Sequence, residues 1–313
     1  MHSHGYNDKS MEPVIQGLYA AAVTPRRLGG QDINLAAMWD LIDHLIDHGA
    51  PGIVLMGATG EFLHFSTAER MRLMGLAAKR SRVPVIFNCS HSTFDGVVEL
   101  AQAADASGAA GILIMPPYFF QYKQDQIEVF YRQVAQTAQL QIPILLYNIP
   151  QFTNPIAYET AAVLLQEGVV QGIKDSSGDL ANFKKLHRLR QQHTFSLMLG
   201  NDSLAVAARS MGCDGIISGV ACAIPELLIA LDHAVVSGAM ERAAHLELRL
   251  HQFIQQADVL PTPMGVKEGT TARGLKAGPH SLSCDGKLRQ DADKFQAWFK
   301  DWLPSVLTEC KNV

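Results

Sequence analysis

One lysine, Lys174, stands where an apolar run gives way to polar and glycine residues. Residues 169–173 before it are mostly Val, Gly and Ile, and Asp-Ser-Ser-Gly follows at 175–178. Short apolar runs bounded by turn residues are typical of buried strands in a parallel sheet. We therefore expect Lys174 near the carboxyl end of a buried strand, where α/β folds place their chemistry.

A lysine in that position could act as a nucleophile. Desolvation among apolar side chains disfavours a charged ammonium, and a neutral amine can attack a carbonyl carbon. Lysine is rarely placed in apolar surroundings without a use. The alternative is a lysine at a strand end whose side chain simply reaches solvent.

A glycine-flanked turn, Gly-Ala-Thr-Gly-Glu at 57–61, follows another apolar run. Gly57, Ala58 and Gly60 would expose backbone N–H groups, and Thr59 adds a hydroxyl. Together these donors could hold a carboxylate. A purely structural tight turn explains the same residues.

Tyr147 lies at the end of a third apolar run, on the strand expected just before that of Lys174. The two strands should pair, so the phenol could carry protons while an imine forms and breaks. A core tyrosine with a satisfied hydroxyl is the alternative.

Gly200 and Gly219 follow the last two runs, where many barrels bind phosphate. The acidic Asp202 argues against a phosphate there.

The apolar runs come in two alternating kinds. Segments starting at Gly49, Gly108 and Gly212 share the pattern Gly-x-x-Gly, whereas 83–88 and 142–148 start with a β-branched residue and proline. Alternate strands of an eight-stranded barrel supply different layers of its interior, so two kinds of strand fit that fold. We expect strands at 18–23, 52–56, 85–89, 111–115, 144–148, 169–174, 195–199 and 215–218.

Helical patterns separate these runs. Ser66 and Glu69 predict a capping box at the start of the second helix. Other helices are expected at 39–48, 94–107, 124–137, 157–166, 180–191, 204–211 and 225–235. Sustained strand–helix alternation predicts an α/β fold, a TIM (β/α)8 barrel. The expected organisation is a frayed tail over 1–14, the barrel over 15–238 and a small C-terminal helical domain over 239–313.

The composition is that of a globular enzyme, with 48% hydrophobic residues, 18% charged residues and a net charge of −4. It predicts neither nucleic-acid nor membrane binding. The start of the chain lacks the apolar core of a signal peptide, and the five cysteines form no C-x-x-C pair. We therefore expect a cytoplasmic protein. His44 and His48 lie beside acidic residues, which favours a solvated helix face over a metal site.

In order and spacing, these residues resemble the dihydrodipicolinate synthase / N-acetylneuraminate lyase family of pyruvate-dependent Schiff-base enzymes. The resemblance covers about 16–302. It rests on Gly-x-Thr-Gly-Glu at 57–61, Tyr-Asn-x-Pro at 147–150, Gly-x-Lys-Asp-x-Ser-Gly at 172–178, Gly-x-Asp at 200–202 and Pro-x-x-Val-Lys at 263–267. Each motif is weak alone, but the set in this order is specific.

The resemblance implies a TIM barrel with a helical extension, assembled as a homotetramer from two dimers. It implies that Lys174 forms an imine with pyruvate or another 2-keto acid and that Tyr147 shuttles protons. Thr59 would hold the keto-acid carboxylate, and the backbone at Ile217 would line the pyruvate. A protonated imine is an electron sink, so this chemistry needs no metal and no organic cofactor.

Several positions depart from the family pattern. Ala58 stands where many members carry Ser or Thr in a hydroxyl relay, and Phe119 stands where the relay's second tyrosine crosses a subunit interface. Tyr118 is adjacent but would point elsewhere on a strand. Phe152 replaces the arginine that binds the aldehyde's carboxylate in the lysine-pathway synthases, and a phenyl ring cannot replace a bidentate cation.

Ser203 and Gly219 likewise replace the Glu and Ser that sialic acid lyases use for the sugar chain. We therefore expect an aldolase or dehydratase for another 2-keto acid, such as a 2-keto-3-deoxy sugar acid, with an aldehyde as the second partner. The alternatives are dihydrodipicolinate synthase and a keto-acid-binding protein with little catalysis. Phe119, Phe152, Tyr118 and Asp202 are candidates for a pocket or an interface.

Overall fold

Eight parallel strands pair in chain order and close into a barrel in the computed structural model, which describes residues 15–27, 32–281 and 284–311. The predicted TIM (β/α)8 fold is confirmed. The strands are β1 (Gly17–Ala21), β2 (Gly52–Leu55), β3 (Val85–Asn88), β4 (Gly111–Ile114), β5 (Ile144–Asn148), β6 (Gly172–Asp175), β7 (Ser196–Leu199) and β8 (Gly215–Ser218).

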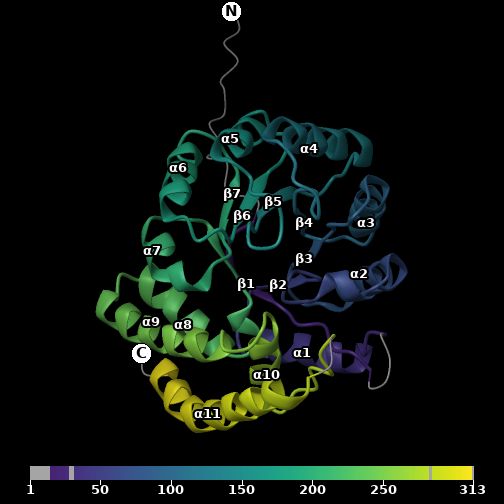
Figure 1. Cartoon of the computed structure of the whole chain (residues 1–313). Helices are drawn as coiled ribbons and strands as arrows, with labels where there is room; N and C mark the ends of the chain where they lie inside the picture. The colour runs from purple at the N-terminus through teal and green to yellow at the C-terminus, as the bar shows by residue number, and fades with distance from the viewer. Residues whose placement is uncertain (1–14, 28–31, 282–283, 312–313) are drawn as a thin grey trace, which may run out of the picture.

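Eight helices surround the strands (Figure 1). They are α1 (Leu35–Asp47), α2 (Thr67–Arg80), α3 (Phe94–Ala106), α4 (Gln124–Ala138), α5 (Tyr158–Gln166), α6 (Leu180–Arg190), α7 (Ala205–Ser210) and α8 (Pro225–Val236). Short 3-10 turns, η1 (Phe62–His64), η2 (Asp202–Leu204) and η3 (Val220–Cys222), follow β2, β7 and β8. With helices on the outside and side chains filling the interior, nearly every strand residue is buried, as parallel sheets require.

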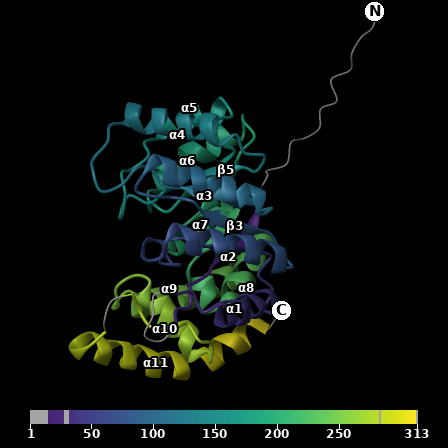
Figure 2. The same cartoon turned by 90° about the vertical axis from the view of Figure 1, so that its right-hand side faces the viewer.

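Three more helices extend the barrel: α9 (Met240–Ala257), α10 (Met264–Ala272) and α11 (Gly286–Lys311). Figure 2 shows α11 along the edge of the molecule opposite α4 and α5. Its Phe295 and Phe299 pack edge-on against Phe253 of α9, with ring centroids 5.9 and 5.7 Å apart. The extension therefore has an aromatic core of its own. The expected boundary at 238/239 falls between α8 and α9, and the division into domains stays a prediction, as does the tail over 1–14, which lies outside the described residues.

Three local expectations are wrong. β6 starts at Gly172 rather than at 169, because the amides of Val169 and Val170 donate to Leu164 at the end of α5. The capping box of α2 is half formed: Ser66 accepts from the Glu69 amide, but the Glu69 carboxylate accepts from the Ile33 amide instead. A long-range partner has replaced the local one.

The helix face with two histidines also differs from expectation. His48 is exposed, but His44 is half-buried and its ring stacks on that of His48 with centroids 4.0 Å apart. Burial lowers the pKa of His44 to about 4, helped by the charges of His48 and Arg273. The described residues contain no cluster of three or more His, Cys, Asp or Glu placed to hold a metal. Over the same residues, no helix combines the length and apolar character needed to cross a membrane.

Candidate active site

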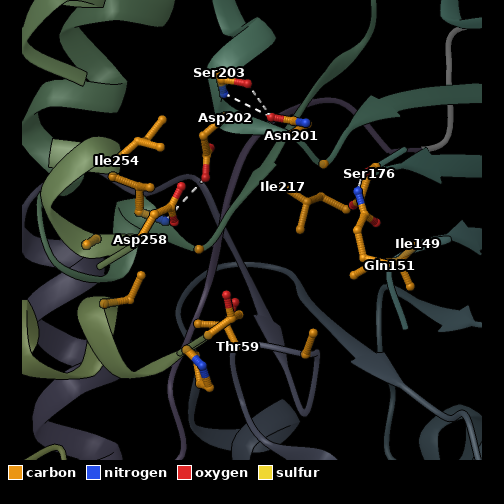
Figure 3. Close-up of a pocket in the computed structure, with 18 of the residues that line it drawn as sticks. Thr59, Ile149, Gln151, Ser176, Asn201, Asp202, Ser203, Ile217, Ile254 and Asp258 are labelled. Atoms are coloured by element: carbon orange, nitrogen blue, oxygen red, sulfur yellow. Dashed lines mark hydrogen bonds between the residues drawn. The ribbon is translucent and has the colours of Figure 1, made fainter. Parts of the chain in front are cut away.

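A cavity of about 410 Å³ opens at the carboxyl ends of the strands, within the size range of small-molecule sites. It collects many of the residues singled out in the sequence: Ala58, Thr59, Tyr147, Phe152, Lys174, Gly200, Asp202, Ser203, Ile217 and Gly219. Figure 3 shows Thr59 across the cavity from Asn201 and Ser203, with Asp258 and Ile254 on one side and Ser176, Gln151 and Ile149 on the other.

Lys174 is only 5% exposed and packs against Tyr147. The two residues are direct partners in the β5–β6 ladder, and the Lys174 Nζ lies 4.3 Å from the centroid of the tyrosine ring. The amine therefore lies over the face of the ring. Strand pairing fixes the relative position of the two side chains before any substrate arrives.

The ends of β5 and β6 are tied together behind these side chains. Asn148 donates its side-chain amide to Asp175 at 3.2 Å, and the Ser177 amide donates to the same carboxylate oxygen at 2.8 Å. Asp175 in turn accepts the Gly200 amide through its backbone carbonyl at 2.8 Å. This buried network holds Lys174 and Tyr147 at the cavity floor.

Two glycines leave room for reactive groups. A Cβ on Gly200 would lie 2.0 Å from the Ser176 Oγ and 2.7 Å from the Lys174 Cε. A Cβ on Gly219 would lie 2.8 Å from the Thr59 Oγ1. Side chains at these two positions would therefore displace Lys174 and Thr59, which explains the glycines without any bound phosphate.

The turn at 57–61 has strained ends. Met56 and Glu61 both adopt left-handed backbone conformations, with φ of 58° and 53°, a conformation that surrounding structure must stabilise in non-glycine residues. The Glu61 amide donates to the Ala58 carbonyl at 3.0 Å and closes the turn around Thr59. Gly57 and Gly60 support the turn from behind and are not among the residues that line the cavity.

Asp202 brings an acid to the cavity. Burial raises its pKa to about 6, against the opposing effects of hydrogen bonds from Ser218 and Val220 and of the charge of Lys174. Its Oδ2 accepts a long hydrogen bond of 3.5 Å from the Val220 amide, and its Oδ1 has no partner among the described residues. That oxygen is itself buried, and a buried carboxylate oxygen without a partner is uncommon in a residue that lines a cavity,.

The expected interface residues separate in the structure. Phe119 is 92% exposed, on a loop after β4 rather than on a strand, so the expectation that Tyr118 follows strand alternation is wrong. Tyr118 instead lines an adjoining cavity of about 250 Å³ that shares Ala58 and Phe152 with the larger one. Phe152 is 59% exposed at the rim.

Sequence reasoning missed much of the outer wall. Ser176 lines the cavity two residues after Lys174, inside the Gly-x-Lys-Asp-x-Ser-Gly motif. Its Oγ is buried and has no hydrogen-bond partner among the described residues. Ile254, Ala257 and Asp258 come from the end of α9. Only the tertiary packing of the C-terminal helices brings them to the barrel mouth, so no local pattern marks them.

Comparisons with known proteins agree with this geometry. The sequence model of the Dihydrodipicolinate synthetase family matches residues 14–295. The 4-hydroxy-tetrahydrodipicolinate synthase of Moorella thermoacetica is 30% identical over 288 residues, which cover 91% of this chain and 97% of that protein. The synthase of Methanospirillum hungatei is 27% identical over 90% of this chain and 98% of its own length.

Solved structures share the architecture. A putative dihydrodipicolinate synthetase from Pseudomonas aeruginosa is 26% identical, has a TM-score of 0.83 and covers 93% of this chain and 99% of its own. YagE, a prophage protein of this family from E. coli K12 solved in complex with pyruvate, is 26% identical, with a TM-score of 0.82 and coverage of 93% and 98%. The KD(P)GA of T. tenax, at 24% identity, shares the fold with a TM-score of 0.81 over 94% of this chain and 100% of its own.

The family match spans most of the chain, and the barrel places a buried lysine and its tyrosine at the carboxyl ends of β6 and β5. The chain belongs to the dihydrodipicolinate synthetase family and is a Schiff-base-forming lyase of the pyruvate-dependent, class I aldolase type.

Proposed function

We propose that this lyase cleaves or dehydrates a 2-keto acid with a hydroxylated chain, such as a 2-keto-3-deoxy sugar acid. The observation that carries the proposal is the asymmetry of the cavity. Lys174 is the only basic side chain among the described residues that line it, whereas Gln151, Ser176, Asn201, Asp202, Ser203 and Asp258 give it a polar and acidic outer part. Hydroxyl groups suit such a wall, because they donate to carboxylates and amide oxygens.

Lys174 is the proposed nucleophile. Its neutral amine attacks the keto carbon, the resulting carbinolamine loses water, and a protonated imine forms. Tyr147 is the proposed proton carrier for these steps, since strand pairing keeps its ring against the amine. The Tyr147 phenol can then accept the proton that the nitrogen loses and donate a proton to the departing hydroxyl.

The keto-acid carboxylate is proposed to bind at the turn around Thr59. The Thr59 hydroxyl and the Ala58 backbone lie at the cavity, and Ile217 of β8 borders it from the barrel interior. Backbone N–H groups and a hydroxyl can hold a carboxylate without a cationic side chain. This arrangement sets the keto carbon against Lys174 and turns the rest of the substrate toward the outer wall.

Bond cleavage then follows from the imine. The protonated imine accepts the electron pair of the C3–C4 bond as the C4 hydroxyl loses its proton, and an aldehyde departs. The enamine that remains is protonated at C3, and water releases pyruvate from Lys174. In the dehydratase direction the enamine, formed by loss of a C3 proton, expels the C4 hydroxyl as water.

Dihydrodipicolinate synthase activity is the second candidate, favoured by the names of the curated relatives. Aspartate semialdehyde carries a carboxylate of its own, however, and Phe152 provides no cation at the rim. Asp202 and Asp258 would repel that carboxylate,. A keto-acid-binding protein with little catalysis is the third candidate, because Ala58 lacks a relay hydroxyl.

A substrate comparison tests the proposal. The enzyme is assayed for pyruvate and aldehyde release from a 2-keto-3-deoxy sugar acid, for its dehydration product, and for condensation of pyruvate with aspartate semialdehyde. We expect turnover of the sugar acid at least 100-fold more efficient than the condensation. The reverse order would establish the synthase, and pyruvate binding without turnover of either substrate would establish the binding protein.

A homotetramer made of two dimers and a cytoplasmic location remain part of this proposal. Phe119 and Phe120 are 92% and 65% exposed and pack edge-to-face, with centroids 5.0 Å apart. Two exposed aromatic rings on one loop are typical of a surface that another molecule covers. Light scattering should give the mass of four chains, and a monomeric mass would contradict the proposal.

A further inference from the structure

A buried ion pair joins the C-terminal helices to the turn that carries Thr59. Lys267 of α10 is 1% exposed, and its Nζ donates to the Glu61 Oε2 at 2.7 Å. The same ammonium donates to the Pro279 carbonyl at 2.7 Å, on the loop after α10. One side chain thus connects α10, its following loop and the turn after β2.

Glu61 is poorly placed without that partner. It is 8% exposed and holds a left-handed backbone conformation with φ of 53°. Burial alone would raise the pKa of Glu61, but the charge and the hydrogen bond of Lys267, together with a hydrogen bond from Ser281 and the charge of Arg26, hold that pKa below its usual value. Lys267 is the strongest of these partners, so without it the buried carboxylate would turn toward water, and the backbone of residue 61 would move with it.

Any movement of Glu61 reaches Thr59 directly. The Glu61 amide donates to the Ala58 carbonyl at 3.0 Å, so Thr59 and Gly60 lie inside the loop that this bond closes. The turn packs closely against its own start, because a Cβ on Gly60 would lie 3.0 Å from the Met56 amide nitrogen. The opposite side is equally tight, where Gly219 faces the Thr59 hydroxyl.

Lys267 does not take part in the chemistry. It is absent from the residues that line the cavity, although Gly265 and Val266 on the same helix do line it. Its ammonium makes hydrogen bonds to Glu61 and to the Pro279 carbonyl, both within the fold. The residue is therefore placed to act on substrate only through the turn.

We propose that Lys267 is a positioning residue for keto-acid binding: through its buried ion pair with Glu61 it holds the turn at 57–61 so that Thr59 and the adjacent amides meet the substrate carboxylate. The inference rests on the proposed role of Thr59. It predicts that affinity for the keto-acid carboxylate, rather than reactivity of Lys174, depends on a salt bridge outside the cavity.

The test compares Lys267→Met with a matched control, Glu268→Gln. Glu268 is the next residue on α10 and is also buried, and it pairs with His280 at 2.6 Å and with Gln296. It thus binds the same following loop but not the turn after β2. Both variants remove one charge from one buried pair on one helix.

The readout is borohydride trapping of the imine as a function of pyruvate concentration. In Lys267→Met the half-saturating pyruvate concentration should rise roughly 10- to 100-fold, the range that small misplacements of binding groups produce. The trapping rate at saturation should stay within about threefold of wild type. In Glu268→Gln both quantities should stay within about twofold. Hydroxyacetone, a ketone without a carboxylate, should be trapped equally well by all three proteins.

A double-mutant cycle adds a second criterion. If Lys267 acts through Thr59, the combination of Lys267→Met with Thr59→Val should weaken pyruvate binding by less than the product of the two single effects. Independent effects that multiply would overturn the inference. Should Lys267→Met prove insoluble, Glu61→Gln carries the same test from the other partner, with a rise of at least threefold expected.

Four further results would contradict the proposal. If folded Lys267→Met has an unchanged half-saturating pyruvate concentration, the ion pair has no role in keto-acid binding. Equal losses with pyruvate and hydroxyacetone, or equal losses in Glu268→Gln, would show general damage to the fold. If the wild-type protein traps no pyruvate on Lys174, the proposed function fails and this inference fails with it. If the wild type does trap pyruvate and Lys267→Met behaves like it, only this inference fails.

Discussion

The two halves of the cavity are built differently. The inner half consists of Tyr147 and Lys174 on the paired strands β5 and β6, Ile217 on β8, and Thr59 on a short turn after β2. The outer half consists of Phe152, Asp202 and Asp258 on loops and at the end of α9. The inner half is fixed by strand register and buried hydrogen bonds, whereas the outer half depends on how the loops and C-terminal helices pack. The inner half should therefore determine the type of reaction, and the outer half should determine the choice of substrate.

Replacing Lys174 should break the inner half completely. Lys174→Met keeps the length of the side chain but removes the amine, and we expect turnover to fall by roughly 10⁴-fold or more. Steady-state assay with the preferred keto acid measures the loss. Lys184→Met, an exposed lysine on α6, is the control and should retain wild-type activity. Substantial turnover in Lys174→Met would place the chemistry elsewhere.

Tyr147→Phe should leave the inner half in place but slow its proton transfers. The ring contact with Lys174 survives, so the fold and the pyruvate site should be preserved. We expect kcat to fall by roughly 10² to 10⁴-fold, the usual contribution of a positioned acid or base. Single-turnover trapping with pyruvate should still mark Lys174, only more slowly. A kcat close to wild type would assign the proton carrier to another group.

Asp202→Asn tests the outer half. With a hydroxylated keto acid we expect kcat/KM to fall roughly 10- to 100-fold, whereas trapping of pyruvate should change less than threefold. The ionised carboxylate accepts hydroxyl protons, so the wild-type profile of kcat/KM should rise with pH through about 6. The variant should lack that rise. Equal losses for both substrates would place Asp202 in the inner half.

The same substitution should stabilise the free protein. Folding raises the pKa of Asp202 from its usual value of 3.8 to about 6. The folded state therefore binds more protons than the unfolded state between those values, and stability falls as pH rises through that window. Asp202→Asn should raise Tm above pH 6 and have little effect at pH 4. Thermal scans at the two pH values decide this.

Gly219→Ala should weaken the inner half by a smaller amount. A Cβ there meets the Thr59 hydroxyl at 2.8 Å and must move it. We expect the KM for pyruvate to rise about tenfold, equivalent to about 1.4 kcal/mol of binding, with kcat nearly unchanged. Gly75→Ala on α2 is the control, because its nearest neighbour would be an ordinary contact at 3.9 Å. No change in KM would show that the Thr59 position is not needed.

Phe152→Arg changes the outer half of the cavity and should give the smallest effect. A guanidinium at the rim offers a partner for an aldehyde carboxylate. We expect condensation with aspartate semialdehyde to increase by a few fold, since Asp202 and Asp258 remain. Cleavage of a sugar acid should change little. A large gain would show that one residue decides the substrate class.

The sequence predicted the inner half well because its signals are local. Lys174, Tyr147 and Thr59 each follow a short apolar run, and eight such runs in alternation leave few folds to choose from,. The match between predicted and observed strands is close except at the start of β6, where α5 accepts the backbone hydrogen bonds of Val169 and Val170.

The outer half could not be predicted from the same signals. Asp258 lies in a helical segment about 80 residues after Lys174, and only the packing of α9 against the barrel brings it to the mouth. Phe119 follows a strand, yet the chain bends at Phe119 itself, where φ is 80°, and the side chain is exposed. Glu69 found a partner on another segment instead of its own helix. Long-range contacts decide these positions, and a single sequence does not record them.

Borohydride reduction in the presence of pyruvate, followed by intact mass and peptide mapping, tests the central claim most directly. The account predicts one reduced adduct per chain, on Lys174, and its loss in Lys174→Met. An adduct on another lysine, including the buried Lys267, or no adduct at all would contradict the assigned mechanism.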